Sequence, residues 1–314
     1  MIRVLVVVIA VVFGAFFVIS QGKGVGLVSP IGKVYGTAKV EVVNSWFPKE
    51  KFNVWDTTSL NISAKSAIAV NAQTGEIIFN KNSKEKLPVA STVKIMTALV
   101  ALENADPSAL YTVSEKAAAV GENSMGLTVG EKLTLGELLY GLMLVSGNDA
   151  AVTVAEGVSG SEGAFVTKMN GMVVALGLGD TKFVNASGLD EDSGNGYSTA
   201  YDMAVISHYV WQKYELFRKI SSTYNEYIDY TPEHKAFDLY NDTNLLTTYP
   251  GVRGIKPGFT WEAGLCLVTY AENDGKKIIA VILGSDDRRG EMKELLDYSF
   301  GTYGIRVSHP GLDL

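Results

Sequence analysis

The chain has 314 residues, 47% of them hydrophobic and 19% charged, which is enough for a sizeable core in one large or two smaller domains. Lys and Arg total 27 against 34 Asp and Glu, and the net charge of −7 argues against a nucleic-acid-binding surface or a polybasic membrane patch. Cys266 is the only cysteine, which excludes an internal disulfide, and the three histidines are too scattered to suggest a zinc site.

The first twenty residues read as an export segment. Arg3 precedes an uninterrupted apolar or small run from Val4 to Ile19, whose length falls between that of a signal-peptide core and a full membrane span of roughly 20 residues. Residues 1–20 are therefore predicted to be an export signal or a membrane anchor, and both interpretations stay open. The protein is expected in the cell envelope, at the outer face of the cytoplasmic membrane or in the periplasm, and an uncleaved segment would attach it to the membrane. A single cysteine in an exported chain favours a bacterial envelope.

Residues 21–62 are Gly-rich and then mixed, and we interpret them as a spacer in which "AKVEVVNSW" could form a strand. The folded domain is predicted over residues 63–306, followed by a tail at 307–314. It opens with "AIAVNAQTGEIIFNKN", whose alternation around Thr74 and Gly75 predicts a β-hairpin.

The next segment, "PVASTVKIMTALVALE", predicts a buried helix that begins near Ala90 or Ser91. Ser91 and Lys94 lie three residues apart, so both side chains share one face at the helix N-terminus. In one interpretation Ser91 caps the helix and Lys94 extends its ammonium to water. In the other, Ser91 is a nucleophile and Lys94 its proton acceptor. This requires a lysine pKa lowered from about 10.4 by burial and by a second cation.

Two long apolar stretches follow, "TLGELLYGLMLVSGNDAAVTVAEGV" and "GAFVTKMNGMVVALGLG", and both show helical spacing. Ser146, Gly147 and Asn148 interrupt the first of them. An ordinary turn with Asn148 or Asp149 as the N-cap would explain this interruption.

The chain then returns to strands. "GLCLVTYAEN" and "KKIIAVILGS" are joined by an Asp274-Gly275 turn, and a closing helix is predicted from Arg289 to Tyr303. Lys256 stands at the start of a further predicted strand, where a solvated edge lysine is the ordinary explanation. Strands from both chain ends predict an α/β fold of the α+β kind, with one antiparallel sheet flanked by helices and a mainly helical lobe inserted.

Taken together, Ser-x-x-Lys at Ser91, Ser-Gly-Asn 55 residues later and Lys-Pro-Gly at Lys256 reproduce the three signatures of serine penicillin-interacting enzymes in order. From roughly Ser66 to Tyr303 the chain resembles the D-alanyl-D-alanine carboxypeptidases of serine peptidase family S11, the low-molecular-mass penicillin-binding proteins. The segments "ASTVKIMTA", "SGNDAA", "TKFVNASGLD", "YSTAYDMA" and "GIKPGFTWEAGLCLV" carry this likeness. It implies the serine β-lactamase and penicillin-binding-protein fold, with the active site between lobe and sheet.

The resemblance also implies an activity and its partners. The substrate would be the peptidoglycan pentapeptide ending in D-Ala-D-Ala. Ser91 would form an acyl-enzyme and release the last D-alanine, while Lys94 accepts the proton of Ser91. Beta-lactams would inhibit the enzyme as substrate mimics, and no metal or organic cofactor would be needed.

Further roles carry over by the same resemblance. Lys256 would supply the second cation and attract the terminal carboxylate of the substrate, and Ser146 would relay a proton to the leaving amine. Asn148 would hold Lys94 and the substrate amide. The backbone N–H groups of Ser91 and Phe259 would form the oxyanion hole, and Gly258 would lie with Lys256 and Phe259 in the substrate-binding strand.

Several departures from the family pattern affect these expectations. The usual Lys-Thr-Gly is here Lys256-Pro257-Gly258, a usual Pro-His pair is Ala186-Ser187, and Arg253 replaces a common acidic residue. With Leu314 as the last residue and no second β-rich domain or amphipathic tail, membrane attachment is expected from the N-terminus.

Two other functions are compatible with the motifs. Pro257 motivates a peptidoglycan-binding module that keeps the fold with weakened catalysis. A class A β-lactamase would need a deacylating glutamate in a Glu-x-x-Leu-Asn loop after Ser-Gly-Asn, and the chain has none there.

Overall fold

The computed structural model describes residues 46–50, 60–191, 194–243 and 245–309. The predicted export segment and nearly all of the possible strand "AKVEVVNSW" lie outside the described residues. Among the described residues, no helix is long and apolar enough to cross a membrane.

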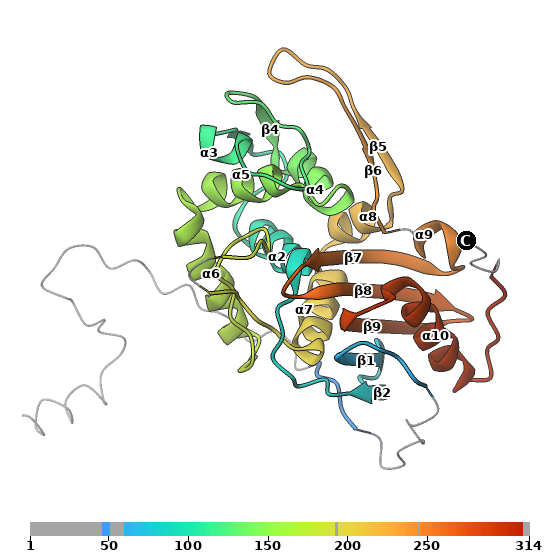
Figure 1. Ribbon diagram of the computed structural model, residues 1–314. Coiled ribbons are helices and arrows are strands. Elements are labelled where there is room, and N and C mark those ends of the chain that lie inside the picture. Colours follow the sequence, from blue (N-terminus) through green and yellow to red (C-terminus); the bar gives the residue numbers. More distant parts are fainter. Residues whose placement is uncertain (1–45, 51–59, 192–193, 244, 310–314) are drawn as a thin grey trace, which may run out of the picture. The chain divides into compact units, whose positions relative to one another are not determined.

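A five-stranded sheet in the order β2-β1-β9-β8-β7 forms the centre of the domain, and every neighbouring pair in it is antiparallel (Figure 1). Its strands are β1 (Ser66–Asn71), β2 (Ile77–Lys81), β7 (Val252–Thr260), β8 (Gly264–Asn273) and β9 (Lys276–Ser285). The first strand of the domain lies beside the last. This confirms the prediction of one sheet made from both ends of the chain.

The two predicted hairpins of the sheet are confirmed, and their turn chemistry explains them. Gly75 has φ +77°, and the side chain of Asn71 accepts hydrogen bonds from the backbone N–H groups of Gln73 and Thr74. Asp274 and Gly275 both have positive φ, as a two-residue turn between antiparallel strands requires.

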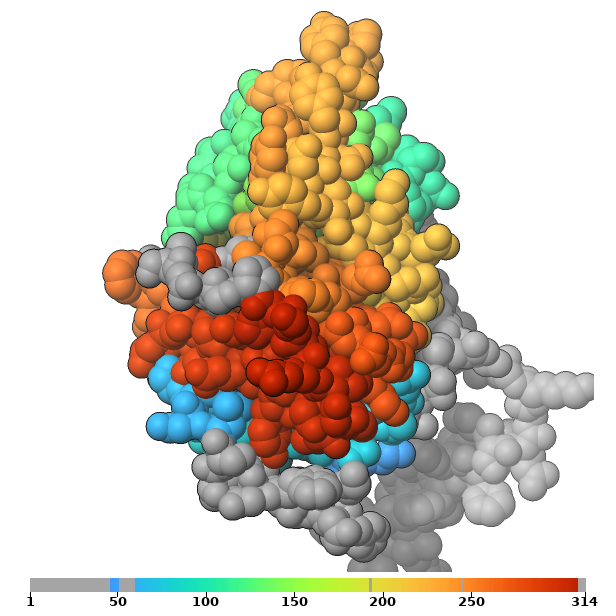
Figure 2. Space-filling model, turned by 90° about the vertical axis from the view of Figure 1, so that its right-hand side faces the viewer, coloured from blue at the N-terminus to red at the C-terminus, as the bar shows by residue number. Residues whose placement is uncertain are grey.

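The sheet is buried on both faces, and side-chain alternation divides it between two cores. Ile68, Val70, Val268 and Val281 belong to the core on the lobe side of the sheet, which also contains residues of α2 (Lys94–Asn104) and α7 (Ala200–Lys213). Alternate positions of the same strands pack against the C-terminal helix α10 (Arg288–Gly301), which Figure 2 shows in red over that side. The near-continuous apolar sequence of β8 and β9 follows from this double burial.

The inserted lobe is mainly helical, as predicted, and the helical spacing of its long apolar stretches is confirmed. Its elements are η2 (Ala90–Val93), α2 (Lys94–Asn104), β3 (Leu110–Thr112), α3 (Glu115–Ala118), β4 (Lys132–Thr134), α4 (Leu135–Leu144), α5 (Asn148–Ser159) and α6 (Glu162–Ala175). Thr134 and Glu137 form a capping box that fixes the start of α4. The end of α4 consequently has a defined position, and the Ser146 turn follows it directly.

The chain returns to the sheet through α7 (Ala200–Lys213), α8 (Glu215–Ser222), a hairpin of β5 (Asn225–Ile228) and β6 (Phe237–Tyr240), and α9 (Leu245–Thr248). Figure 2 shows the β5–β6 hairpin at the top of the view. Its Ile228, Phe237 and Leu239 side chains are buried, whereas Tyr227 and Tyr240 are exposed. The base of this hairpin leads directly to Asp242, beside Lys256.

Three details differ from the sequence predictions. The closing helix begins at Arg288 and ends at Gly301, so Tyr303 lies beyond it. Part of the predicted spacer packs on the domain, because Trp46 stacks on His208 with 3.8 Å between ring centroids, and Lys49 pairs with Glu76. Lys256 lies in the middle of β7 and not at its start.

Candidate active site

Ser91 lies in a tight turn at the head of the first helix of the lobe. The turn is a 3-10 helix that continues into α2, and Ala90 enters it with φ +48°. The side chain of Ser91 makes no capping hydrogen bond, so the interpretation of Ser91 as an ordinary N-cap is wrong. Its hydroxyl lies 2.9 Å from the amine nitrogen of Lys94.

Lys94 is fully buried, which contradicts the alternative in which its ammonium reaches water. Its Nζ lies 2.8 Å from Asn148 Oδ1 and 2.7 Å from the carbonyl oxygen of Ser187. Burial, followed by the charge of Lys256, holds the pKa of Lys94 well below its usual value, while Asp242, Glu122 and Asp149 oppose this shift. Lys94 is therefore a lysine whose neutral form is favoured.

The three partners of Lys94 dictate the orientation of a neutral amine. The carbonyl oxygens of Asn148 and Ser187 can only accept hydrogen bonds, so they take the two N–H groups of the amine. The remaining lone pair then points at Ser91 Oγ, the only partner of the three that can donate a hydrogen bond. The site thus aims a base at the hydroxyl.

Ser146, Gly147 and Asn148 form the turn between α4 and α5, and they bring Asn148 to Lys94. The N-cap of α5 is Gly147 without a side-chain bond, so the prediction of Asn148 or Asp149 as the cap is wrong. Asn148 instead donates from Nδ2 to the carbonyl oxygen of Gly121 at 3.0 Å, which fixes its Oδ1 toward Lys94. Ser146 is buried with φ +60°, a backbone conformation held by the surrounding turn.

Asp149 fixes the segment 124–127 beside the site. Its carboxylate accepts hydrogen bonds from the backbone N–H groups of Met125, Gly126 and Leu127 and from the hydroxyl of Ser124. The segment that carries Gly121 and these residues is thereby tied to the start of α5.

Lys256 is buried with no exposed side-chain surface, so the interpretation as a solvated edge lysine is wrong. Its Nζ lies 3.1 and 3.2 Å from the two carboxylate oxygens of Asp242. Burial lowers the pKa of Lys256, while Asp242 raises it by charge and by hydrogen bonding. Lys256 is thus the second cation that the lowered pKa of Lys94 requires, and Asp242 is its counter-ion.

Strand β7 passes very close to the Ser91 turn at Gly258. A Cβ on Gly258 would lie 3.0 Å from the Ser91 backbone nitrogen and 3.1 Å from Ala90 Cβ. Arg288 Nη1 donates to the Gly258 carbonyl oxygen at 2.8 Å, which holds the strand from its other side. Phe259 follows with 46% of its surface exposed, so the residue beside this contact is open to a ligand.

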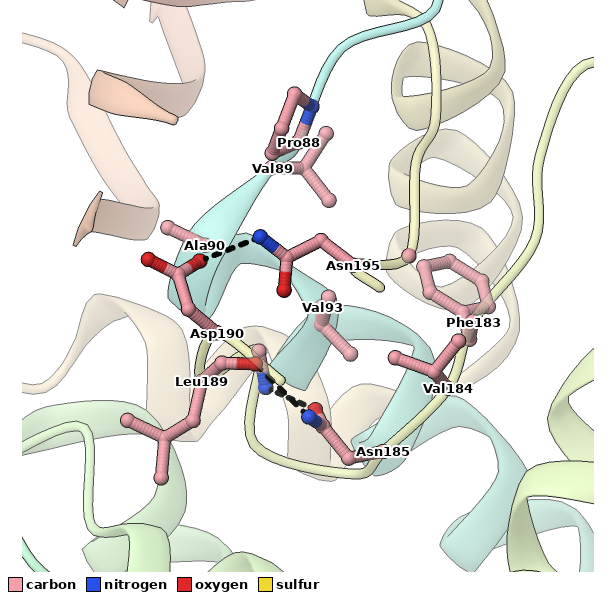
Figure 3. A pocket seen from close by; sticks show the side chains of 12 residues that line it. Pro88, Val89, Ala90, Val93, Phe183, Val184, Asn185, Leu189, Asp190 and Asn195 are labelled. Atoms are coloured by element: carbon pink, nitrogen blue, oxygen red, sulfur yellow. Dashed lines mark hydrogen bonds between the residues drawn. The ribbon is translucent and has the colours of Figure 1, made fainter. Parts of the chain in front are cut away.

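The back of the Ser91 turn is supported by residues 183–185, 188–190 and 195–196, which line a small pocket with Pro88, Val89, Ala90 and Val93 (Figure 3). Asn185 donates to the Leu189 carbonyl oxygen at 2.9 Å and Asn195 to Asp190 at 3.1 Å, and both bonds hold the loop in shape. The Cβ of any other residue at Gly188 would lie 2.0 Å from the Ala90 carbonyl oxygen. This packing places the Ser187 carbonyl oxygen at Lys94.

The structure thus brings Ser91, Lys94, Asn148, Lys256 and Gly258 to the meeting of lobe and sheet. Sequence reasoning missed the Ser187 carbonyl oxygen and Asp242. A backbone acceptor leaves no signal in side-chain identity. Asp242 stands in the polar stretch "NDTN", where a single acidic residue has many ordinary explanations.

A family model described as D-alanyl-D-alanine carboxypeptidase matches residues 53–287. The D-alanyl-D-alanine carboxypeptidase DacF of Bacillus subtilis is 40% identical over 262 residues, which cover 81% of this chain and 66% of the relative. DacA of Escherichia coli is 32% identical over 254 residues, and the match covers 76% of this chain and 61% of DacA.

Solved structures are also similar. The crystal structure of the Streptomyces K15 DD-transpeptidase has a TM-score of 0.72 at 30% identity, covering 77% of this chain and 98% of that one. The carboxypeptidase DacD of Francisella tularensis has a TM-score of 0.71 at 27% identity, with 79% and 73% covered.

Proposed function

This chain belongs to the D-alanyl-D-alanine carboxypeptidase family S11, and we propose from this premise that it removes the terminal D-alanine of peptidoglycan stem peptides through an acyl-enzyme on Ser91. The observation that supports the proposal most strongly is the environment of Lys94. This buried amine has a lowered pKa and lies 2.9 Å from the Ser91 hydroxyl.

In the proposed reaction, Ser91 Oγ attacks the carbonyl carbon of the penultimate D-alanine while Lys94 takes the hydroxyl proton. The oxyanion is received by the backbone N–H groups of Ser91 and Phe259. Each such donor is worth about 3 to 4 kcal/mol in other serine hydrolases. Ser146 passes a proton to the departing D-alanine amine, and Asn148 holds both Lys94 and the substrate amide. Water then hydrolyses the ester.

The ligand's terminal carboxylate is assigned to the cationic end of the site. Lys256 and Arg288 are the cations there, and the carboxylate of a β-lactam would take the same position. Penicillins would acylate Ser91, and the acyl-enzyme would turn over slowly.

We further propose that the protein acts in the cell envelope. The support is the apolar segment from Val4 to Ile19 in the sequence, with Arg3 before it. N-terminal sequencing of the protein recovered from the envelope fraction would distinguish a cleaved signal from a retained anchor. Recovery from the cytoplasm alone would reject the localisation.

Steady-state release of D-alanine from a pentapeptide tests the activity. Release that disappears in Ser91→Ala supports the carboxypeptidase. Binding of the peptide without release would favour the peptidoglycan-binding module that Pro257 motivates. The matching substitution Ser222→Ala, a serine at the end of α8 whose hydroxyl donates to the Arg253 carbonyl oxygen, is a control that should keep the activity.

A further inference from the structure

The Lys256 ammonium is inaccessible to an incoming anion in this structure. Its side chain has no exposed surface, whereas that of its partner Asp242 is 34% exposed. Both oxygens of the Asp242 carboxylate lie within 3.2 Å of the ammonium nitrogen. The accessible member of the pair is consequently the negative one.

Arg288, a second cation near Asp242, contacts the backbone of β7. Its side chain is half-buried and donates to the Gly258 carbonyl oxygen at 2.8 Å. Its positive charge repels that of Lys256 and lowers the pKa of that lysine. Asp242 interacts favourably with both cations. One carboxylate therefore partly neutralises the two positive groups that a carboxylate-bearing ligand would use.

Asp242 is attached to the lobe, while Lys256 lies in β7 of the sheet and Arg288 is the first residue of α10. Its backbone N–H donates to the Leu144 carbonyl oxygen at the end of α4, two residues before Ser146. The neighbouring Asn241 donates to the Thr223 carbonyl oxygen and accepts from the Thr243 N–H. The backbone of Asp242 is thus fixed, so its carboxylate can leave Lys256 only by rotation of the side chain.

We propose that Asp242 is an internal counter-ion that occupies the carboxylate subsite and must be displaced by the terminal carboxylate of a substrate or β-lactam. This inference rests on the proposed function and deepens it. The displacement makes carboxylate-terminated ligands bind more weakly than the two cations alone would allow. It also keeps a buried ammonium paired when the site is empty.

Replacing Asp242 by Asn tests the displacement, because Asn keeps the shape and an oxygen acceptor for Lys256 while removing the charge. We expect kcat/KM for a D-Ala-D-Ala peptide to rise roughly 3- to 30-fold, mainly through KM. This range lies between the value of an exposed ion pair and that of a hydrogen bond to a buried charge. Asp242→Glu keeps the charge and should not show this rise in kcat/KM.

The ligand provides a second control. Acylation by benzylpenicillin, which carries a carboxylate, should accelerate in Asp242→Asn, whereas acylation by its methyl ester should not. Asp238→Asn removes an exposed carboxylate from the same hairpin and should change neither rate.

The pH dependence gives an independent readout. The charged groups that act on Lys94 are Lys256, Asp242, Glu122 and Asp149, and Asp242 raises the pKa of Lys94. Asp242→Asn should therefore lower the pKa of Lys94 and move the acidic limb of the kcat/KM profile to lower pH.

The outcomes separate this inference from the proposed function. If the wild-type protein neither releases D-alanine nor reacts with benzylpenicillin, the proposed function fails. If it does either, but Asp242→Asn reacts equally or more slowly with carboxylate ligands while folded by its melting temperature, the displacement is wrong and Asp242 positions Lys256 instead. Equal acceleration with the methyl ester would also overturn it.

Discussion

At the scale of single residues, the chemistry of the site depends on keeping the amine of one buried lysine neutral. Lys94 is surrounded by two carbonyl oxygens and one hydroxyl, and desolvation, followed by the charge of buried Lys256, lowers its pKa. An ammonium in this position would be both desolvated and repelled by Lys256. The neutral amine is stable there, and it is the form that can accept a proton.

Lys94→Arg tests the need for that neutral form. A guanidinium does not deprotonate in proteins, so the charge is kept while the base is lost. We expect acylation and D-alanine release to fall by roughly 10² to 10⁴-fold. Stopped-flow acylation with benzylpenicillin is the measurement, and near-normal rates would show that Lys94 only supports the structure.

The pH profile of kcat/KM should respond to Lys256. In the proposed mechanism the neutral amine of Lys94 is the active form, so the rate should rise as pH passes upward through the lowered pKa of Lys94. Lys256→Gln removes a charge that lowers this pKa and leaves Asp242, which raises it. The acidic limb should therefore move to higher pH, whatever the change in KM. An unmoved limb would mean that burial alone sets the pKa.

Pro257 is tolerated because β7 is the edge strand of the described sheet, paired with β8 on one side. The cost of the proline is the hydroxyl of the family threonine, a hydrogen bond to a charged carboxylate worth about 1.5 to 3 kcal/mol. We expect Pro257→Thr to raise kcat/KM for a D-Ala-D-Ala peptide roughly ten- to a hundredfold, with little change in melting temperature. Unchanged or lower activity would mean that Pro257 belongs to a different substrate anchor.

The sequence motifs named residues that the structure brings together, but they gave no sign of the contacts that the backbone makes. Ser91, Lys94 and Lys256 could be named from spacing and resemblance. The burial of Lys256 could not, because a lysine on an edge strand is exposed unless another element covers it. The contact between Lys94 and the Ser187 carbonyl oxygen depends on the fold of a loop 93 residues away in the chain.

At the scale of elements, the site is made by the approach of β7 to the turn η2. This approach needs a residue without a side chain at Gly258, since a Cβ there would lie 3.0 Å from the Ser91 nitrogen and 3.2 Å from the Thr92 nitrogen. These are the N–H groups at the head of the helix, and the Ser91 N–H is one of the two proposed oxyanion donors. Steric crowding by the Ser91 turn therefore explains why the third residue of the Lys-Pro-Gly motif is glycine.

Gly258→Ala should therefore separate strand and turn by a few tenths of an ångström. We expect kcat/KM to fall by roughly 10- to 100-fold, part of the value of one oxyanion donor, and the free energy of unfolding to fall by about 1 to 3 kcal/mol.

Gly171→Ala is the matched control, because Gly171 lies inside α6 with nothing within 4 Å of its added Cβ. It should keep the activity and raise the free energy of unfolding by about 0.5 to 1 kcal/mol. Full activity in Gly258→Ala would show that this close approach is not needed for catalysis.

Most elements could be predicted because their signals are local. The two hairpins were given by alternation and turn residues, and the lobe helices by apolar spacing. The cap at Gly147 and the 3-10 start at Ala90 could not be predicted, because both backbones are held by distant groups. The Asp149 carboxylate accepts hydrogen bonds from the segment 124–127 and so does not cap α5, and Gly188 packs against Ala90.

At the scale of the whole domain, the sheet explains why the site is assembled only on complete folding. Strand β1 pairs with β9 although more than 200 residues separate them, and Lys256 enters from the last third of the chain. The lobe contributes Ser91, Lys94 and Asn148, and the sheet contributes Lys256 and Gly258. The antiparallel sheet with an inserted helical lobe could be predicted, since strand patterns at both chain ends leave few other arrangements.

The central claim is that Ser91 is the nucleophile of a penicillin-reactive D-Ala-D-Ala carboxypeptidase. Intact-mass spectrometry after incubation with benzylpenicillin tests it most directly, followed by peptide mapping of the adduct. We predict one adduct per chain, located on Ser91 and absent from Ser91→Ala. Failure to label at high drug concentration, or labelling that persists in Ser91→Ala, would contradict the assignment.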